Sequence, residues 1–571
     1  MNIQETHGSY PCLYVEKLHF RNGMDLELNP DDIVVFVGPN NAGKTQCLKD
    51  IDNIIGNTLS EPIVLADVDM VLTQSDDNMG WLRKFSKRKK SDNSEIYHGI
   101  GYSVYNYHIQ DNKFSSNYLY EYRSLFIKQL TTKERLTIVD PPEILDMDEP
   151  ATHPIHNVKA NDDLLGILNE SFHKVFGEYV TPDFDSRRIA LHVGDIIKLE
   201  GDFESEAERL NEFKRRLHAL PALQDQGDGM VSLTGIILYL LMPNYSMFLI
   251  DEPESFLHPP QAKILGEVIS NLTKDKQLFL STHSQDFLKG LIEKGGNRVK
   301  IVRVTRSGNE NITKLLSNDN VNAIWHDTLL RHSNIIDSVF HESVCVCESD
   351  SDCALYSIIL NDLKERAGKP FSTLFTHVGG KARFHKIISY LKLLGVDYRI
   401  IPDLDVLNDR NTIKTLYKSC GQDWQIIKDD YDLLDKEVKA MVPYPPKSLK
   451  ELQSEVDKIF EEAIASGENE LSKNNITNIR ATIAPPKGWQ KLKKEGISAL
   501  PSEESKHALA EIDAALKDEK IYMVPVGELE NFFKDISGHG PNWALNVLEN
   551  HPDLSDHCYD GIRNFIASLG L

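Results

Sequence analysis

Four carboxylates in the C-terminal half of the sequence have a spacing that suits a metal ion. One apolar run ends in Glu348, with Asp352 four residues later, and a second apolar run leads into Asp403 and Asp405. Because the carboxyl ends of parallel strands gather at one sheet edge, we expect these side chains to converge. If the second strand continues through both aspartates, they also share a face. Carboxylate oxygens are the ligands that Mg²⁺ prefers.

The alternative is that these acids only cap loops. For an isolated Asp-x-Asp that interpretation would be preferred, and the pairing with Glu348 and Asp352 favours the metal site.

A second chemical motif lies near the N-terminus. The apolar run 33–37 is followed at once by Gly-Pro-Asn-Asn-Ala-Gly-Lys-Thr, a complete P-loop pattern between an expected strand and a helix from about Thr45. Backbone N–H groups of such a loop cradle phosphates, Lys44 reaches the β- and γ-phosphates, and Thr45 ligates Mg²⁺. The expected nucleotide-binding residues are Gly38, Asn40, Asn41, Gly43, Lys44 and Thr45.

Three later motifs complete this pattern. A glycine-rich turn with Gly227 and Gly229 precedes an apolar helix, where it could meet the γ-phosphate of a nucleotide held by a second subunit. An apolar strand then ends in Asp251 and Glu252, expected to hold Mg²⁺ and to polarise the attacking water. A further strand places His283 beside the γ-phosphate as a sensor.

These motifs, in this order, resemble the ABC-type ATPase head. Such heads bind nucleotide between two protomers, so the resemblance implies a homodimer or a higher homo-oligomer. The turn Gly-Asp-Gly-Met departs from the transporter signature Leu-Ser-Gly-Gly-Gln and is nearer to the DNA-repair and OLD (overcoming lysogenisation defect) side of the superfamily.

The acids resemble the Toprim domain, in which a strand ends in Glu, an acid follows four residues on, and a later strand ends in Asp-x-Asp. Ser349 stands where Toprim domains commonly have Gly. An ATPase head followed by Toprim resembles the OLD-family nucleases, several of which act in anti-phage defence. The resemblance implies one more acid after a late strand at 521–526; Glu530 fits, with Glu528 as the alternative, and an acid that merely begins a helix is the competing interpretation.

The expected fold class is therefore α/β. Residues 1–335 would form an ABC-type P-loop ATPase head, with a lateral region and an inserted helical or dimerisation lobe at about 55–220. Residues 336–571 would form a parallel-sheet Toprim domain with a helical insertion at about 411–520. The connection 291–343 contains no Gly/Ser-rich spacer, which predicts rigid coupling of the two halves.

Composition sets broader limits. No apolar run approaches 18 residues and the N-terminus lacks a basic and an apolar signal region, so we expect a cytoplasmic protein without a membrane span. The net charge of −23 argues against a surface coated for nucleic acid, but it leaves local basic tracks at 83–90 and 487–494. Such charge runs are usually only solvated faces, and that interpretation is preferred for each track. The second track is the better candidate for DNA, because Trp489 could stack on a base beside the cations.

The sequence thus predicts an ATP-regulated, divalent-metal-dependent DNA endonuclease. Glu252 would serve ATP hydrolysis, and Glu348, Asp403 and Asp405 would serve phosphodiester cleavage. The expected metal ligands, for Mg²⁺ or at the acid site also Mn²⁺, are Thr45, Asp251, Glu348, Asp352, Asp403, Asp405 and Glu530.

The alternative function is an ATPase sensor or scaffold that recruits or restrains a toxic partner, with a Toprim domain that is non-catalytic or acts on RNA. The natural substrate (DNA, tRNA or another), the trigger and any defence partner, such as a retron reverse transcriptase with its DNA, stay open. So does the sign of ATP control, for which we favour restraint by ATP.

Overall fold

The chain forms two compact units, Met1–Asn322 and Ala323–Leu571. The computed structural model describes residues 2–91, 94–146, 149, 151–199, 203–316, 335–441, 448–467, 470–483 and 488–571. The predicted boundary at 335/336 lies 13 residues beyond the observed one, and residues 317–334 of the connection, including Trp325, lie outside the described residues.

A six-stranded sheet forms the centre of the first unit, in the order β11-β14-β15-β4-β16-β17. Neighbouring strands are parallel except for the last pair. The central strands β14, β15 and β4 are short and mostly apolar, as expected for strands covered on both faces. The strands of this sheet are β11 (Ile127–Leu130), β14 (Met247–Asp251), β15 (Gln277–Ser281), β4 (Ile33–Val37), β16 (Val299–Ser307) and β17 (Glu310–Leu316).

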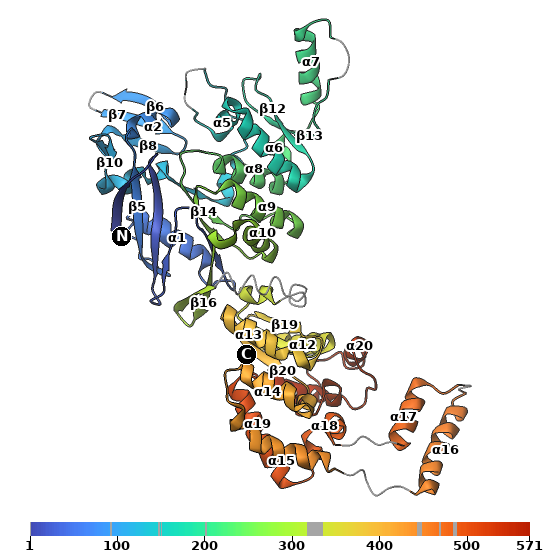
Figure 1. Cartoon of the computed structure of the whole chain (residues 1–571). Coiled ribbons are helices and arrows are strands. Elements are labelled where there is room, and N and C mark those ends of the chain that lie inside the picture. Colours follow the sequence, from blue (N-terminus) through green and yellow to red (C-terminus); the bar gives the residue numbers. More distant parts are fainter. Residues whose placement is uncertain are drawn as a thin grey trace. The chain divides into compact units, whose positions relative to one another are not determined.

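Helices cover this sheet (Figure 1). Helix α1 (Lys44–Ile55) contacts the central strands and β5 (Leu65–Gln74), while α9 (Pro259–Leu272) and α10 (Gln285–Gly295) pack against each other. Helix α8 (Asp228–Leu240) packs on α4 (Thr132–Thr137) and is buried along nearly its whole length.

A second, four-stranded sheet has the order β1-β5-β2-β3. It contains a hairpin, formed by β2 (Cys12–Phe20) and β3 (Asp25–Glu27), together with β1 (Asn2–His7). The apolar face of this sheet packs with α1 in one hydrophobic core.

The predicted inserted lobe is only partly helical. Its first half holds α2 (Asn78–Phe85), the antiparallel strands β6 (Lys87–Ser91), β7 (Ser94–Gly99) and β8 (Tyr102–Tyr105), the pair β9 (Ile109–Gln110) and β10 (Lys113–Phe114), and α3 (Leu119–Tyr122). The second half holds α5 (Pro154–Ala160), α6 (Asp162–Phe176), β12 (Tyr179–Pro182), β13 (Leu191–Gly194) and α7 (Glu206–Leu217). Short strands therefore predominate in residues 87–114, and helices predominate in residues 154–217.

The second unit is built on a parallel three-stranded sheet in the order β19-β18-β20. The strands are β18 (Ser343–Cys347), β19 (Thr373–His377) and β20 (Asp397–Ile401). The helices that connect them are α12 (Asp350–Arg366) and α13 (Phe384–Leu394), and α20 (Pro541–Asn550) and α21 (Asp560–Ser568) pack on α12. β18 is central, so its end is flanked by both neighbours.

The insertion between β20 and the C-terminal part is helical in the residues described, as predicted. It comprises α14 (Arg410–Ser419), α15 (Lys428–Lys439), α16 (Leu449–Ala465), α17 (Lys473–Ile483), α18 (Trp489–Glu495) and α19 (Glu503–Asp518).

The predicted strand at 521–526 is absent. Ile521 makes a single parallel bridge to Ile400, and Val524 N–H donates to the Pro402 carbonyl, so the segment lies beside β20 without forming a regular strand. In the described parts of the chain, no helix is long and apolar enough to cross a membrane.

Candidate functional site

The P-loop connects β4 to α1 and depends on two glycines. Gly38 has φ +148°, and a Cβ there would lie 2.0 Å from the Val304 carbonyl oxygen. Gly43, with φ +105°, is the residue before the helix. Only glycine adopts these conformations without strain, so the two glycines allow the tight turn whose backbone N–H groups can bind a phosphate. Asn40 and Asn41 are exposed in the same loop.

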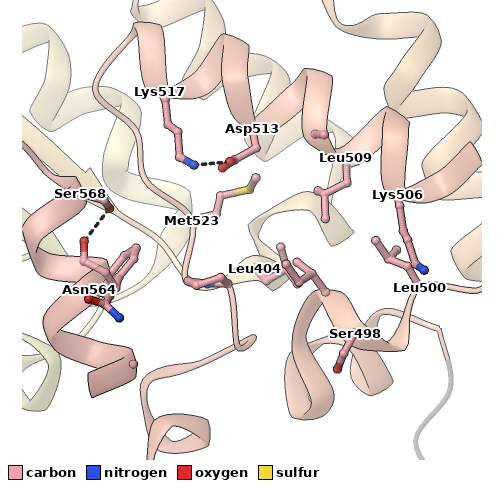
Figure 2. A pocket seen from close by; sticks show the side chains of 15 residues that line it. Leu404, Ser498, Leu500, Lys506, Leu509, Asp513, Lys517, Met523, Asn564 and Ser568 are labelled. Atoms are coloured by element: carbon pink, nitrogen blue, oxygen red, sulfur yellow. Dashed lines mark hydrogen bonds and ion pairs between the residues drawn. The ribbon is translucent and has the colours of Figure 1, made fainter. Parts of the chain in front are cut away.

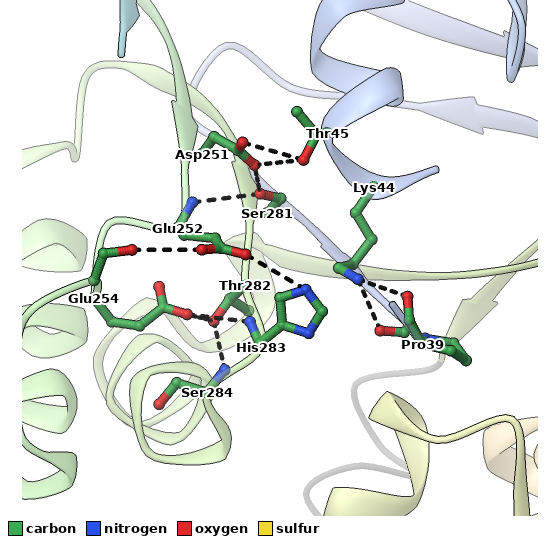
Figure 3. A network of polar contacts seen from close by, with 12 residues as sticks. Pro39, Lys44, Thr45, Asp251, Glu252, Glu254, Ser281, Thr282, His283 and Ser284 are labelled. Carbon is green, nitrogen blue, oxygen red and sulfur yellow. Dashed lines mark hydrogen bonds and ion pairs between the residues drawn. The ribbon is translucent and has the colours of Figure 1, made fainter. Parts of the chain in front are cut away.

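Lys44 lies across the loop. Its Nζ donates to the Gly38 and Pro39 carbonyls at 2.9 and 2.8 Å (Figure 3). Burial lowers the pKa of Lys44 to about 8, partly offset by Glu252 and Asp251. A phosphate would give this ammonium the anionic partner that its burial calls for.

Asp251, at the end of β14, faces the loop. The Thr45 hydroxyl donates to its two carboxylate oxygens at 3.0 and 3.1 Å, and the Ser281 hydroxyl donates to one of them. A hydroxyl and a carboxylate that are already adjacent are the two protein ligands that Mg²⁺ takes in P-loop sites, so these residues fit the expected ion.

Glu252 follows with φ +46°, a left-handed conformation that is rare for a residue with a side chain. Its backbone is held by Arg135, which donates to the Glu252 and Asp251 carbonyls at 3.1 and 3.2 Å and is fully buried. The strained turn aims the Glu252 carboxylate towards His283 Nε2, 3.4 Å away (Figure 3). Sequence reasoning missed Arg135, because no motif surrounds it.

Glu254 fixes the opposite side of the site. Its Oε1 accepts from the Thr282 hydroxyl at 2.5 Å and from the His283 N–H at 3.1 Å, while its Oε2 is inaccessible to solvent and has no hydrogen-bond partner. Burial raises the pKa of Glu254 to about 7. Burial and the Lys44 ammonium lower the pKa of His283. The neutral imidazole is therefore favoured beside the P-loop.

The two glycines of the predicted signature lie at the start of α8. Gly229 packs against the backbone of Phe256, where a Cβ would lie 2.7 Å from the carbonyl oxygen. Gly227 has φ −62°, which any residue adopts, and its Cβ position is open. No hydrogen bond described for this chain joins either glycine to its own P-loop, so a nucleotide contact from them stays a prediction about a second protomer.

In the second unit, the structure brings Glu348, Asp403 and Asp405 together. One carboxylate oxygen from each lies within 4.8 Å of the others. Glu348 follows β18 directly, and the aspartates follow the neighbouring β20. The reason given for the two aspartates was wrong: β20 ends at Ile401, and a 3₁₀ helix, Leu404–Asn408, turns both side chains to the cluster.

Asp352 is not part of this group. Its carboxylate accepts from the Ser349 N–H at 2.9 Å, and the Ser349 hydroxyl accepts from the Asp352 N–H at 3.4 Å. This reciprocal capping box begins α12. Ser349 has φ −129°, so glycine is not required at this turn. Asp352 positions the Glu348 turn, while its carboxylate still lines the same cleft.

The cleft has a volume of about 490 Å³. Glu530 lies in it, within the 3₁₀ helix Leu529–Phe532, and accepts from the Gly540 N–H at 3.4 Å. Glu528, the alternative, is also in the cleft, and both acids therefore reach the region of the cluster.

Two lysines contact the acids. Lys493 Nζ lies 3.3 Å from Asp403, 3.5 Å from Asp405 and 3.5 Å from Glu528. Lys381 Nζ lies 3.0 Å from Asp405. Burial opposes the charge of Lys493, but the surrounding carboxylates outweigh it and raise its pKa. Lys493 belongs to the basic track 487–494, but its contact with the acids was not predicted, because Lys493 is 90 residues from Asp403 in sequence.

The acids are still under-compensated. Burial, and next the Glu348 charge, raise the pKa of Asp403 to about 8, and burial followed by Asp405 raises that of Glu348. Glu348 Oε2 and Asp405 Oδ1 are buried without a hydrogen-bond partner. Buried carboxylate oxygens of this kind call for a cation, so the residues fit a hard divalent ion.

Trp489 does not present its ring for stacking. It is 4% exposed, and its Nε1 donates to Asp435 at 2.9 Å. The prediction that it stacks on a base was wrong, since its position in α18 makes it part of the core of the helical insertion. Lys487 lies outside the described residues.

Behind the acid-bearing turn lies a cavity of about 670 Å³ with mainly apolar walls (Figure 2). Leu404, between the two aspartates in sequence, forms part of its wall, with Met523 and Leu509 opposite. This packing holds the turn between the two aspartates through Leu404.

Comparisons with known proteins bear on the first unit. The family described as "AAA domain, putative AbiEii toxin, Type IV TA system" matches residues 33–288. No curated protein matches the chain. The first unit is therefore a P-loop domain of ATPase type, and its fold leads us to expect ATP binding.

Solved SMC head domains are similar at a low level over about half the chain. The SMC head bound to the C-terminal winged-helix domain of ScpA is 13% identical, with a TM-score of 0.34, covering 54% of this chain and 99% of that one. The head from Thermotoga maritima is 13% identical, with a TM-score of 0.27 and coverages of 54% and 98%. These TM-scores are too low to support an argument about function.

Proposed function

We propose that this protein is an ATP-regulated, divalent-metal-dependent DNA endonuclease. The observation that carries the proposal is the convergence of Glu348, Asp403 and Asp405 at the ends of two adjacent parallel strands, with two of their oxygens buried and unpaired. Nucleases that act through metal ions need such a set of oxygen ligands in an open cleft.

The acids would hold Mg²⁺ or Mn²⁺, which when bound supplies activation of water and stabilisation of the leaving 3′-oxygen. Glu348, Asp403 and Asp405 would be the ligands at the cluster, and Glu530 lines the same cleft. Asp352 keeps Glu348 in position through its capping box. Lys493 and Lys381 place positive charge at the edge of the acids, where a phosphate of the DNA backbone would lie.

A P-loop site in the first unit and an acid cluster in the second are the two sites expected of an ABC-type head followed by a Toprim domain, as in the OLD-family nucleases. The family match, whose description refers to a toxin–antitoxin system, supports a role in defence. Within that proposal the first unit forms a homodimer or higher homo-oligomer around ATP, with Thr45 and Asp251 at its Mg²⁺ and Glu252 polarising water. A partner such as a retron reverse transcriptase with its DNA would keep the nuclease inactive until it is triggered.

One observation favours the second candidate, a sensor or scaffold whose acid site is not catalytic. Lys493 and Lys381 already contact the acids, and a protein that never binds a cation there would need such neutralisation. The two buried, unpaired oxygens favour the nuclease, because the lysines leave them unsatisfied.

The test is incubation of purified protein with supercoiled plasmid DNA, and in parallel with tRNA, in Mg²⁺ or Mn²⁺. We expect nicked or linear plasmid that disappears when the metal is chelated. An intact plasmid in both metals, with and without ATP, would reject DNA as the substrate, and cleavage of tRNA alone would move the proposal to RNA.

A further inference from the structure

A second group of metal-ligating side chains lies in the C-terminal part of the second unit, and the proposed function does not use it. One donor atom each from His551, Asp556 and Cys558 lies within 4.8 Å of the others. The group combines an imidazole, a carboxylate and a thiol, whereas the acid cluster offers oxygen alone.

The backbone around these residues is fixed by other contacts. His551 follows the last turn of α20, and its carbonyl accepts from the Tyr559 hydroxyl at 2.7 Å. The His551 ring stacks on Phe533, with the ring centroids 6.3 Å apart. Asp556 and Cys558 lie at the start and in the middle of a short 3₁₀ segment, His557–Tyr559. The three side chains are thus brought together before any ion binds.

The His551 ring is also oriented. Its Nε2 is 2.9 Å from Asp535 Oδ2, and in the tautomer that donates this bond, Nδ1 carries the free lone pair. A carboxylate that accepts from one nitrogen of a metal-bound imidazole is a recurrent arrangement in metal sites, where it fixes the tautomer and raises the basicity of the ligand.

We propose that His551, Asp556 and Cys558 bind a borderline divalent transition-metal ion such as Zn²⁺, with Asp535 orienting the imidazole. A thiolate and an imidazole select such an ion over Mg²⁺ or Ca²⁺, which take oxygen ligands. Ligand bonds of about 2.0–2.3 Å need donor atoms closer to one another than 4.8 Å, which rotation of the exposed Asp556 and the partly exposed Cys558 side chains supplies. Water completes the coordination, since Asp556 is exposed and Cys558 is partly exposed.

The ion would join three segments: the end of α20, the 3₁₀ segment, and, through Asp535, the loop that follows Glu530. Its expected effect is on stability, because an ion that binds only the folded protein stabilises it by mass action.

The experiment uses the full chain, stripped with a chelator and titrated with Co²⁺, which reports a bound thiolate by a thiolate-to-cobalt charge-transfer band. We expect the band to saturate at about one equivalent and to disappear on addition of Zn²⁺. Cys558→Ser should abolish it. Cys12→Ser is the matched control, because Cys12 is also partly exposed but lies in the other unit, and it should keep the band.

Absence of the band in the parent, or its persistence in Cys558→Ser, would overturn the proposal. Two further measurements cover a variant that folds poorly. Asp535→Asn should weaken Co²⁺ binding, by about tenfold or more, while keeping the band. Chelation should lower the Tm of the parent and of Cys12→Ser more than that of Cys558→Ser; equal shifts in all three would also count against the site.

Discussion

At the acid cluster, one lysine, Lys493, offsets much of the negative charge of the carboxylates. Lys493 contacts three carboxylates and occupies space that a dication would share, so the two cations compete. We predict that Lys493→Met binds Mn²⁺ more tightly in the absence of nucleotide, by roughly tenfold, or ~1.4 kcal/mol. The variant should also have a lower Tm without metal, because the acids lose their partner.

Calorimetric titration with Mn²⁺ measures the affinity. The control is Lys491→Met, on the same helix with the same 33% side-chain exposure but paired with Glu495. Weaker Mn²⁺ binding by Lys493→Met would show that the lysine helps to hold the ion's ligands in place and does not compete with it.

Glu254 gives a pH dependence at the ATPase site. Its folded pKa, raised by burial to about 7, lies above the value of an unfolded glutamate, so the folded state loses stability as pH rises from about 4.5 to about 7. Glu254→Gln mimics the protonated form and keeps the oxygen that accepts from Thr282. We predict that its free energy of unfolding relative to the parent rises between pH 5 and pH 8 by up to ~3 kcal/mol, and its relative Tm rises with it. Thermal unfolding at both pH values measures this, with the neighbouring Glu252→Gln as control; a pH-independent difference would contradict it.

At the scale of elements, α18 shows why a basic run can mislead. Trp489 anchors the helix by its buried ring and its bond to Asp435, and this anchoring holds Lys493 at the acids. We predict that Trp489→Phe lowers stability by ~1 kcal/mol through loss of the hydrogen bond. DNA affinity, measured by fluorescence anisotropy on catalytically silent protein in EDTA, should be unchanged. A large loss of DNA affinity in Trp489→Phe with an unchanged Tm would instead show that Trp489 stacks on a base.

The elements that sequence predicts best are those with one dominant signal. The strands that lead to Gly38, Asp251 and Glu348 are short apolar runs, each followed at once by a glycine-rich loop or an acidic residue, and all three strands form. The strands of residues 87–114 have only two to six residues each, and β6 is a run of exposed Lys and Arg, so neither periodicity nor hydrophobicity marks them.

The convergence of the acids was predictable from strand order, whereas the turn that achieves it was not. A 3₁₀ helix after Ile401 depends on the packing of Leu404 into an apolar wall, which is a tertiary contact. Arg135 and Lys493 lie far in sequence from the groups they contact, 117 and 90 residues away, and only the folded chain identifies them.

At the scale of the whole molecule, the proposal requires that nucleotide at the first unit control cleavage at the second. We favour restraint by ATP, since an unrestrained nuclease harms its own cell. Lys44→Ala removes the ammonium that nucleotide needs and should cleave plasmid faster than the parent at saturating ATP; Glu252→Gln should bind ATP without hydrolysing it and cleave more slowly. The opposite order would mean that ATP activates, and equal rates would remove the coupling.

The central claim is that Glu348, Asp403 and Asp405 hold the ion that cleaves DNA. The most direct measurement compares plasmid nicking by Asp403→Asn and by the parent at matched Mg²⁺ or Mn²⁺, with ATP turnover recorded on the same samples. Asp429→Asn, the same change at an exposed position on α15, is the control. The account predicts a loss of nicking by orders of magnitude in Asp403→Asn alone, with ATP turnover retained. Equal nicking by Asp403→Asn and the parent would contradict it.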